Sequence, residues 1–298
     1  TDSSAASDVY KRQGLYRSSD NLTTWNLVGQ PWDNFSQIDF HPTNSSIIYT
    51  SKTNNDSNIY ISTDTGITFN TSGSIQGVSN GNIITNSSNI KISISGDCEN
   101  CIYIGSSDGI WKSSDLGDNF DLISGTYIDE ISNYGAFAVS DVNSDVILYG
   151  DIDTHMSFDG GANFEKTTFW SEGNSNYDQT GTYVHADLRG AVCIDGVFWV
   201  NTDGLLCKSE DNGVTWEIFE GQSIRENYNL GVSQSNHYRT ISGSQDNGTS
   251  IKTENSWIEF YGADGMEGII HPLNDDWMIG SFQFGGKRRT KDGGFTQD

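Results

Sequence analysis

Several polar side chains that could bind a ligand stand in the second half of the chain, within short unrepeated segments. Three of them, His185, Asp187 and Arg189, lie in the segment HADLR. The others lie in NTDG, SQDNG and GADG, and they are Asp203, Gln245, Asp246, Asn247 and Asp264. A histidine with several carboxylates could hold a cation or polarise a sugar hydroxyl. Asp-Gly and Asp-Asn-Gly also form turns, and Asp187 with Arg189 could form a local ion pair, so a purely structural role is the simpler alternative.

Aromatic side chains offer a second candidate ligand surface. Trp170 and Tyr177 fall in the polar stretch TFWSEGNSNYDQTGTY, and Trp32 and Trp199 also lie outside the repeated motifs. Long polar loops often carry function, and an aromatic ring there could stack on a sugar or hold a peptide. The alternative is that this stretch only covers one end of the fold.

Six aspartates recur in octets that share the pattern S/T-x-D-x-G-x-T-W/F, with some positions lost. They are Asp20, Asp64, Asp115, Asp159, Asp211 and Asp292. The first five follow one another at intervals of 44 to 52 residues, and the last interval, of 81 residues, contains a degenerate copy, TSIKTENSWIEF. The sequence therefore holds seven units. A set of carboxylates could be catalytic, but one per repeat cannot converge on one substrate, so we expect these six to build turns.

The elements that must position these residues are short β-strands. Each unit carries a strand directly before its octet, such as NIYIS from Asn58, and a hairpin further upstream, such as FAVSDVNSDVILYG from Phe137. Four strands in a repeat of 40 to 52 residues, without helical periodicity, predict an all-β, seven-bladed β-propeller of four-stranded antiparallel blades. Each octet would form the turn between a third and a fourth strand. The ligand candidates would lie near strand starts that line the central channel.

The extent of the domain follows from the same pattern. Residues 1–13, TDSSAASDVYKRQ, have no strand pattern and are expected to be a non-native scar or a disordered leader. Residues 14–298 are then a single propeller domain. Because the pattern opens at a third strand and stops where a fourth should begin, we expect incomplete blades at both ends and a fragment of a larger protein.

The octets resemble the Asp boxes, or BNR repeats, of sialidases, sortilin-type receptors and xyloglucan-degrading endoglucanases. Four longer segments, YVHADLRGAV, VNTDGLLCKSEDNGVTW, SGSQDNGTS and YGADGMEGIIHP, resemble parts of large secreted BNR and sortilin-like proteins of Bacteroidetes. The resemblance covers nearly all of residues 14–298 and implies the propeller fold. It also implies an extracellular or cell-surface location, but no one function, since the same box occurs in enzymes, receptors and assembly factors.

Charge and cysteine content limit the partners. The 16 Lys and Arg residues against 40 Asp and Glu give a formal net charge of −24, which disfavours nucleic acid and anionic membranes. No apolar run is long enough for membrane insertion, and we expect a monomer without a cofactor, with calcium left open. Cys98 and Cys101 flank a turn where a local disulfide could form, whereas Cys193 and Cys207 sit in apolar runs as buried thiols.

Motifs that catalysis would need are missing. The sialidase resemblance would imply an F/Y-R-I-P motif and the endoglucanase resemblance an R-T-D-V-G-G segment; neither occurs, and RTKDGG from Arg289 is only an octet with a similar look. No catalytic residue is therefore assigned. We expect a non-catalytic binding or scaffolding propeller of a secreted or cell-surface bacterial protein, which recognises a polysaccharide or a protein. The alternative is one propeller of a glycoside hydrolase, xyloglucanase-like rather than sialidase-like.

Overall fold

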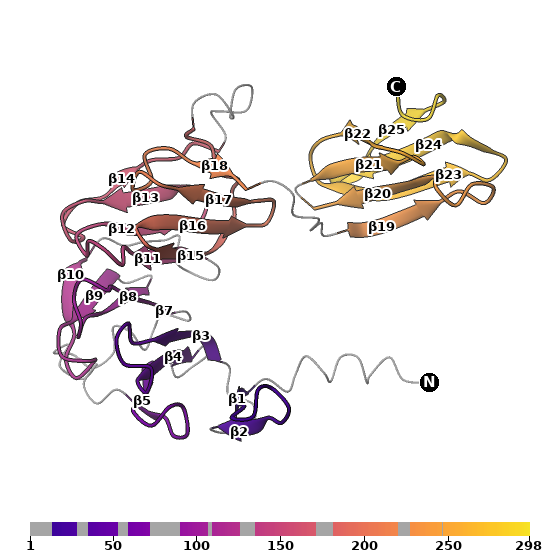
Figure 1. Cartoon of the computed structure of the whole chain (residues 1–298). Helices are drawn as coiled ribbons and strands as arrows, with labels where there is room; N and C mark the ends of the chain where they lie inside the picture. The colour runs from indigo at the N-terminus through magenta and orange to yellow at the C-terminus, as the bar shows by residue number, and fades with distance from the viewer. Residues whose placement is uncertain are drawn as a thin grey trace. The chain divides into compact units, whose positions relative to one another are not determined.

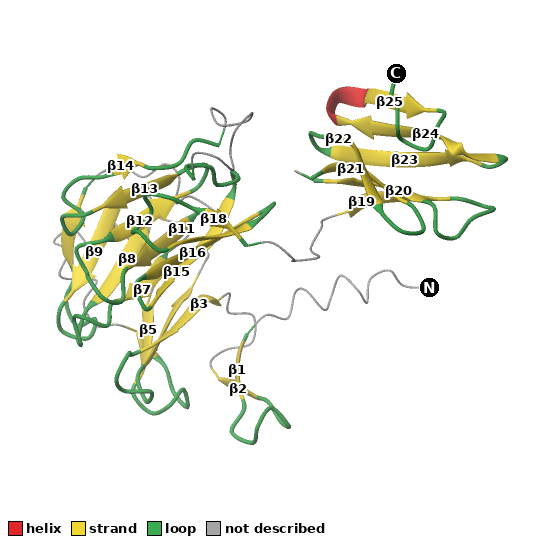
Figure 2. Ribbon diagram, turned by 45° about the horizontal axis from the view of Figure 1, so that its top comes forward, coloured by secondary structure: helices red, strands yellow, loops and turns green. Residues whose placement is uncertain are grey.

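A computed structural model describes residues 14–28, 35–52, 59–71, 90–106, 109–125, 135–170, 181–219, 227–245 and 247–298. The chain divides into two compact units, unit 1 (Thr1–Phe219) and unit 2 (Glu220–Asp298). The regular structure of the described residues is antiparallel β-strand apart from one short 3-10 turn, η3 (Gln283–Gly285), drawn in red in Figure 2. No helix within these ranges is long and apolar enough to cross a membrane.

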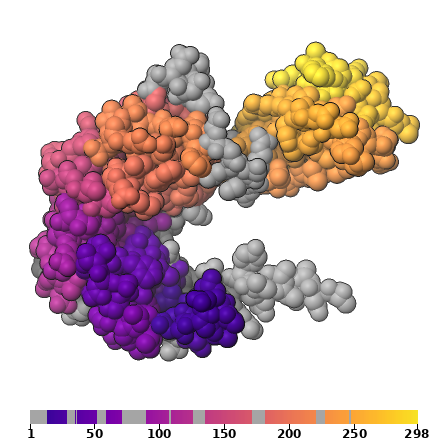
Figure 3. Space-filling view, in the orientation of Figure 1, coloured from indigo at the N-terminus to yellow at the C-terminus, as the bar shows by residue number. Residues whose placement is uncertain are grey.

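The described part of unit 1 forms five sheets, which run in colour from indigo to orange in Figure 3. The first sheet pairs β1 (Leu15–Arg17) with β2 (Asn26–Val28). Four sheets of four strands follow: β3 (Phe35–Phe40), β4 (Ile48–Lys52), β5 (Ile59–Ser62) and β6 (Asn70–Thr71); β7 (Lys91–Ile94), β8 (Ile102–Ser106), β9 (Gly109–Ser113) and β10 (Asp121–Ser124); β11 (Ala136–Val139), β12 (Ile147–Gly150), β13 (Thr154–Ser157) and β14 (Glu165–Lys166); β15 (Leu188–Ile194), β16 (Val197–Thr202), β17 (Leu206–Ser209) and β18 (Glu217–Ile218).

The described part of unit 2 forms two further sheets. Their strands are β19 (Asn227–Val232), β20 (Thr240–Ser244), β21 (Gly248–Lys252) and β22 (Trp257–Tyr261), then β23 (Gly265–His271), β24 (Asn274–Phe282) and β25 (Gly286–Thr290). The predicted all-β fold of repeated propeller blades is confirmed. Among the described strands the first sheet has two and the last has three, so the incomplete blades lie where the sequence pattern predicted them.

Each four-stranded sheet is a meander in which consecutive strands pair. Leu148 on β12, for example, faces Ala138 on β11 and Met156 on β13. In unit 1 the first strands of the complete sheets, β3, β7, β11 and β15, lie next to one another in that order (Figure 1). Residues on these four strands therefore come together although they are far apart in the sequence.

The hydrophobic core lies in layers between neighbouring sheets. The largest layer in unit 1 brings Leu148 and Met156 of the β11–β14 sheet against Phe198, Val200 and Cys207 of the β15–β18 sheet, all of them fully buried. Each such Leu, Met, Val or Phe side chain contributes about 1.5–3 kcal/mol of transfer free energy. A central strand such as β8 is buried along its whole length because both of its faces are covered.

The six octets form the predicted turns after the third strand of a blade. At the turn between β5 and β6, Asp64 Oδ1 accepts hydrogen bonds from Ser62 Oγ at 2.8 Å and Thr68 N at 2.9 Å, and Oδ2 accepts one from Thr68 Oγ1 at 2.7 Å. Gly66, at φ +77°, donates its N–H to Ser62 Oγ at 2.8 Å. The Thr68 hydroxyl, the Thr68 N–H and the Ser62 hydroxyl lower the pKa of Asp64 to about 2. The carboxylate is thus occupied within its own turn.

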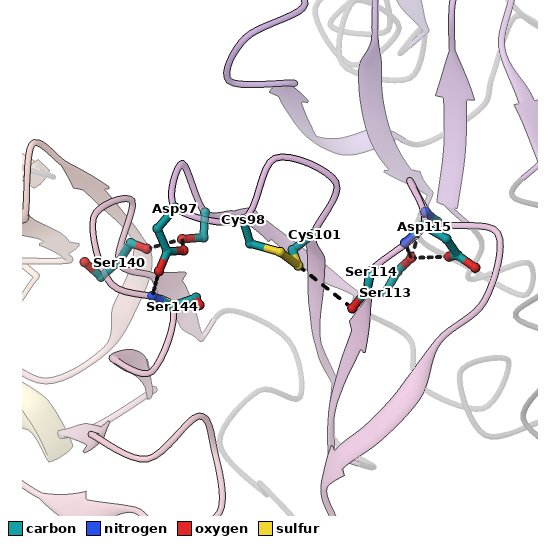
Figure 4. Close-up of a disulfide and its surroundings, with 10 residues drawn as sticks. Asp97, Cys98, Cys101, Ser113, Ser114, Asp115, Ser140 and Ser144 are labelled. Carbon is teal, nitrogen blue, oxygen red and sulfur yellow. Dashed lines mark hydrogen bonds between the residues drawn. A yellow bond between two sulfur atoms is a disulfide. The ribbon is translucent and has the colours of Figure 1, made fainter.

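The cysteines behave as the sequence predicts. Cys98 and Cys101 form a disulfide in the turn between β7 and β8, with Cys101 buried (Figure 4). Cys193 and Cys207 are free, buried thiols. Burial raises the pKa of Cys193 to about 11 and that of Cys207 to about 12, so both stay protonated at neutral pH.

Turns between the first and second strands join neighbouring sheets. Next to the disulfide, Asp97 Oδ2 accepts a hydrogen bond from Ser144 N, 2.8 Å away on the next sheet (Figure 4). One sheet further on, Asp141 Oδ2 accepts from Asp195 N at 2.7 Å and Oδ1 from Gly196 N at 2.9 Å. We call the Asp141 contact with the Asp195–Gly196 turn the inter-blade clasp. It ties the β11–β14 sheet to the β15–β18 sheet at the end of their first strands.

Candidate functional site

Five of the predicted ligand residues lie in one part of unit 1. Trp170 follows β14, His185 and Asp187 precede β15, Arg189 lies on β15, and Asp203 lies in the turn between β16 and β17. The N–H of Asp203 donates to the carbonyl of Asp187 at 3.2 Å, which holds the two loops together. Asp187 has a φ of +59°, a left-handed conformation that Asp tolerates in turns.

The structure pairs Arg189 with Asp203, whereas the sequence analysis offered Asp187 as a local partner. The guanidinium Nε donates to Asp203 Oδ1 and Nη2 donates to Oδ2, a two-point contact in which the side chains are 32% and 13% exposed. The planar guanidinium matches the two carboxylate oxygens, and the pair fixes both side chains. Residue 203 follows the strand that is hydrogen-bonded to β15, so the hairpin register brings it to Arg189 although 14 positions separate them.

His185 and Trp170 lie side by side. Their ring centroids are 6.3 Å apart and their planes are tilted by 43°. The imidazole packs on Gly204, where a Cβ atom would lie 3.0 Å from His185 Cδ2, so a larger residue would push the ring aside. Nδ1 is 2.9 Å from the carbonyl oxygen of Ala186 and donates to it in the Nδ1–H tautomer, which presents Nε2 as an acceptor.

A buried carboxylate that the sequence analysis did not single out positions Trp170. Asp153 Oδ1 accepts a hydrogen bond from the backbone N–H of Trp170 at 2.9 Å, and Asp153 Oδ2 is 2.7 Å from Lys166 Nζ. The Asp153 side chain is 8% exposed, whereas that of Lys166 is 39% exposed. Asp153 ends the turn between β12 and β13, and Asp203 begins the corresponding turn of the next sheet, between β16 and β17. A carboxylate in the same turn of two neighbouring units is the signal in the sequence that could have found Asp153.

A cavity of about 310 Å³ adjoins this cluster on the inner strands of unit 1. Its lining includes Gln37 from β3, Lys91 from β7, Arg189 from β15, and Trp199 and Asn201 from β16. Burial lowers the pKa of Lys91, and no described carboxylate contributes to that shift. Of these five residues, the sequence analysis named only Arg189 and Trp199.

A half-buried acid, Asp39, lies on the same strand as Gln37. Burial raises the pKa of Asp39 to about 6, although a hydrogen bond of 2.8 Å from Gln37 Nε2 opposes the shift. Gln37 also accepts a hydrogen bond from Ile92 N on β7 at 2.9 Å and donates one to the Ile92 carbonyl. Its amide therefore continues the β-ladder from one sheet to the next and holds Asp39 in place.

The remaining described candidates lie in unit 2. In unit 2, Asp264 Oδ2 accepts a hydrogen bond from Gln283 Nε2 at 2.5 Å, Asn247 Nδ2 donates to the carbonyl of Gln245 at 3.1 Å, and the Tyr228 hydroxyl donates to Gln245 Oε1 at 2.6 Å. The Asn247 contact lies within one turn, and the other two join separate segments of unit 2. Asp246, Tyr177 and Trp32 lie outside the described residues. In the nine described ranges, no group of three or more His, Cys, Asp or Glu side chains could hold a metal ion.

Comparisons with known proteins bear on the fold. No protein-family model matches the sequence, and no curated protein matches it. Among solved structures, the chain is similar to the GH74 xyloglucanase from Xanthomonas campestris, with a TM-score of 0.61 and 14% identity over 97% of this chain and 49% of that one. It is also similar to the GH74 enzyme of Niastella koreensis, with a TM-score of 0.58 and 15% identity over 97% of this chain and 47% of that one. At these identities the similarity shows the fold alone, and the chain spans about half the length of either enzyme.

Proposed function

We propose that this chain is a non-catalytic binding propeller of a secreted or cell-surface bacterial protein of the Asp-box, sortilin-like kind, and that its ligand is a carbohydrate. The observation that carries the proposal is the meeting of Trp170 and His185 beside the Arg189–Asp203 ion pair. An indole that is 36% exposed offers an apolar face to a sugar ring, and the imidazole and the ion pair offer polar groups to its hydroxyls.

The carboxylates of this cluster favour binding over catalysis. Glycoside hydrolysis needs one carboxyl group as an acid and another as a base or nucleophile, on either side of the scissile bond. Asp203 is paired with Arg189, and Asp153 with Lys166. The paired cation occupies oxygens of each carboxylate, so neither group is free to act on a glycosidic bond. The octet carboxylates are occupied within their own turns.

The disulfide supports the proposed location. Disulfides form and persist in oxidising compartments, such as the periplasm and the cell exterior, and are rare in the reducing cytosol. The Cys98–Cys101 bridge closes a turn of four residues, and two further thiols remain unpaired within the core. An excess of acidic residues also keeps such a module soluble and away from anionic membrane surfaces.

A second candidate function is one propeller of a glycoside hydrolase. Two observations favour it: the similarity in fold to half of two GH74 enzymes, and Asp39 with a pKa of about 6. A carboxyl group with a raised pKa is what a general acid needs near neutral pH. Release of reducing ends from xyloglucan, abolished by Asp39→Asn, would establish this function instead.

The test of the binding proposal is a polysaccharide panel probed by affinity electrophoresis and isothermal titration calorimetry with the full chain. Trp170→Ala should weaken binding at least tenfold, because a sugar ring loses its stacking partner. Trp257→Ala is the matched control, since Trp257 is an indole 61% exposed on unit 2. Binding to no member of the panel, or equal affinities for wild type and Trp170→Ala, would contradict the proposal.

A further inference from the structure

The cavity of unit 1 is lined by a cation, Lys91, that no carboxylate of the described residues neutralises. Lys91 begins β7 and is half-buried in the cavity lining. Its ammonium makes no ion pair with the described carboxylates, although the whole chain has 40 acidic residues against 16 basic ones. Lys166 and Lys208, by contrast, each have a carboxylate oxygen 2.7 Å from the ammonium nitrogen. Lys91 differs from these two in lining a cavity without such a partner among the described residues.

Removing an ammonium from water costs free energy unless an anion or several hydrogen-bond acceptors replace the water. Burial lowers the pKa of Lys91, which is the direct consequence of that cost. An anion that entered the cavity would repay it and would favour the charged lysine. The cavity is therefore better suited to a negatively charged ligand than to a neutral one.

The other lining groups indicate what the ligand carries besides its charge. Arg189 is compensated by Asp203, so that pair adds no net charge and Lys91 sets the sign of the cavity. Trp199 supplies an aromatic ring, and Asn201 supplies an amide that can bond hydroxyl groups. A Cβ atom at Gly190 would lie 2.9 Å from Asn201 Oδ1, so the glycine makes room for that amide.

The size of the cavity limits the ligand to a small group. Its volume of about 310 Å³ lies at the lower end of the range of roughly 300–1,000 Å³ that is usual for ligand sites. One or two sugar rings fit that volume. An extended polymer would have to lie mostly outside it, with one of its residues inserted.

We propose that Lys91 binds the carboxylate of an acidic sugar residue whose ring packs on Trp199, so that the ligand class is a uronate-containing oligosaccharide. The inference rests on the proposed carbohydrate-binding function and narrows it. The carboxylate accepts hydrogen bonds from the Lys91 ammonium, and the sugar hydroxyls exchange hydrogen bonds with the Asn201 amide. Trp170 and His185 contact the sugar residues of the oligosaccharide that continue beyond the cavity.

The test compares trigalacturonate with its methyl ester, which has the same rings but no charge. Calorimetry on the full chain should give at least tenfold tighter binding of the acid. Lys91→Gln should remove that preference, Lys91→Arg should retain it, and the exposed Lys287→Gln is the matched control. Melting curves of both Lys91 variants would show that they are folded. Equal preference in wild type and Lys91→Gln would overturn the inference.

Two further outcomes separate this inference from the proposed function. Binding of the ester as tightly as the acid, with sensitivity to Trp170→Ala, would overturn the acidic-sugar inference and leave the binding function intact. No binding of any saccharide would overturn both. Sodium sulfate serves as the simple anion: displacement of trigalacturonate by sulfate at equal concentration would show a site for any anion and would overturn the sugar assignment.

Discussion

The inter-blade clasp gives a prediction whose size follows from the structure. Asp141→Ala removes a carboxylate that accepts two backbone hydrogen bonds, from Asp195 N at 2.7 Å and Gly196 N at 2.9 Å. A hydrogen bond to a charged group contributes about 1.5–3 kcal/mol. Both donors lie in one turn that water can reach, so the two contributions do not add in full, and we expect a loss of about 2–4 kcal/mol in the free energy of unfolding.

The assay is thermal unfolding, monitored by calorimetry and by circular dichroism. For a domain of this size each kcal/mol shifts the melting temperature by about 2–4 °C, so Asp141→Ala should lower it by roughly 4–16 °C. Asp118→Ala is the matched control, since Asp118 is exposed and its backbone N–H, which alanine keeps, donates to the carbonyl of Asp115 within the same turn. A surface change of this kind should stay within about 0.5 kcal/mol of wild type. Equal melting temperatures for the two variants would refute the clasp.

The same contact gives the pH dependence of the effect. Burial raises the pKa of Asp141, but hydrogen bonds from Gly196 and Asp195 outweigh it and hold the pKa below its usual value. A carboxylate with a lowered pKa stabilises the fold above the pKa of the unfolded state, about 4, and loses that contribution as the pH falls through the native pKa. The difference between wild type and Asp141→Ala should therefore be largest near pH 7 and should shrink below pH 4.

Three other predictions concern the core and the net charge. Cys193 and Cys207 should not react with Ellman's reagent at pH 8 in the native chain and should both react in guanidinium, because burial raises their pKa values to about 11 and 12. Gly213→Ala should destabilise the fold by about 1–3 kcal/mol, since φ is +80° and a Cβ atom would lie 2.7 Å from Met156 Sδ. The control in the same unfolding assay is Gly262→Ala, because a Cβ atom at Gly262 would meet no other atom within 4 Å. Sodium chloride should raise the melting temperature, because it screens the repulsion within a chain of net charge −24, and equal values at low and high salt would contradict this.

The parts of the fold that the sequence predicted are those built from local contacts. In an octet the aspartate, the serine or threonine before it and the residue four positions later bond one another, as Asp64 does with Ser62 and Thr68. The eight residues of an octet therefore make among themselves the hydrogen bonds that form the turn, which is why the pattern alone predicts it. The Cys98–Cys101 turn is local in the same sense, and it was predicted for the same reason.

The residues that the sequence analysis missed depend on contacts between sheets. Gln37 bonds the backbone of Ile92, which is 55 positions away, and the burial of Asp39 and Lys91 follows from that approach of β3 to β7. No spacing rule links such positions. The Arg189–Asp203 pair is an intermediate case. The Asp195–Gly196 turn fixes a hairpin register in which Gly190 pairs with Asn201, but the register shifts between Leu188 and Gly190. Counting back from the turn therefore brings residue 189 to the end of β16 but does not by itself predict Asp203 as its partner.

The central claim is that the chain binds a carbohydrate without cleaving it. The most direct measurement is release of reducing ends from a polysaccharide that the full chain has been shown to bind, at saturating concentration and with Trp170→Ala in parallel. The account predicts retention of the polymer by wild type, weakened by the variant, with no reducing ends above the protein-free control. Steady release of reducing ends, lost in Asp39→Asn, would contradict it and make this propeller part of a glycoside hydrolase.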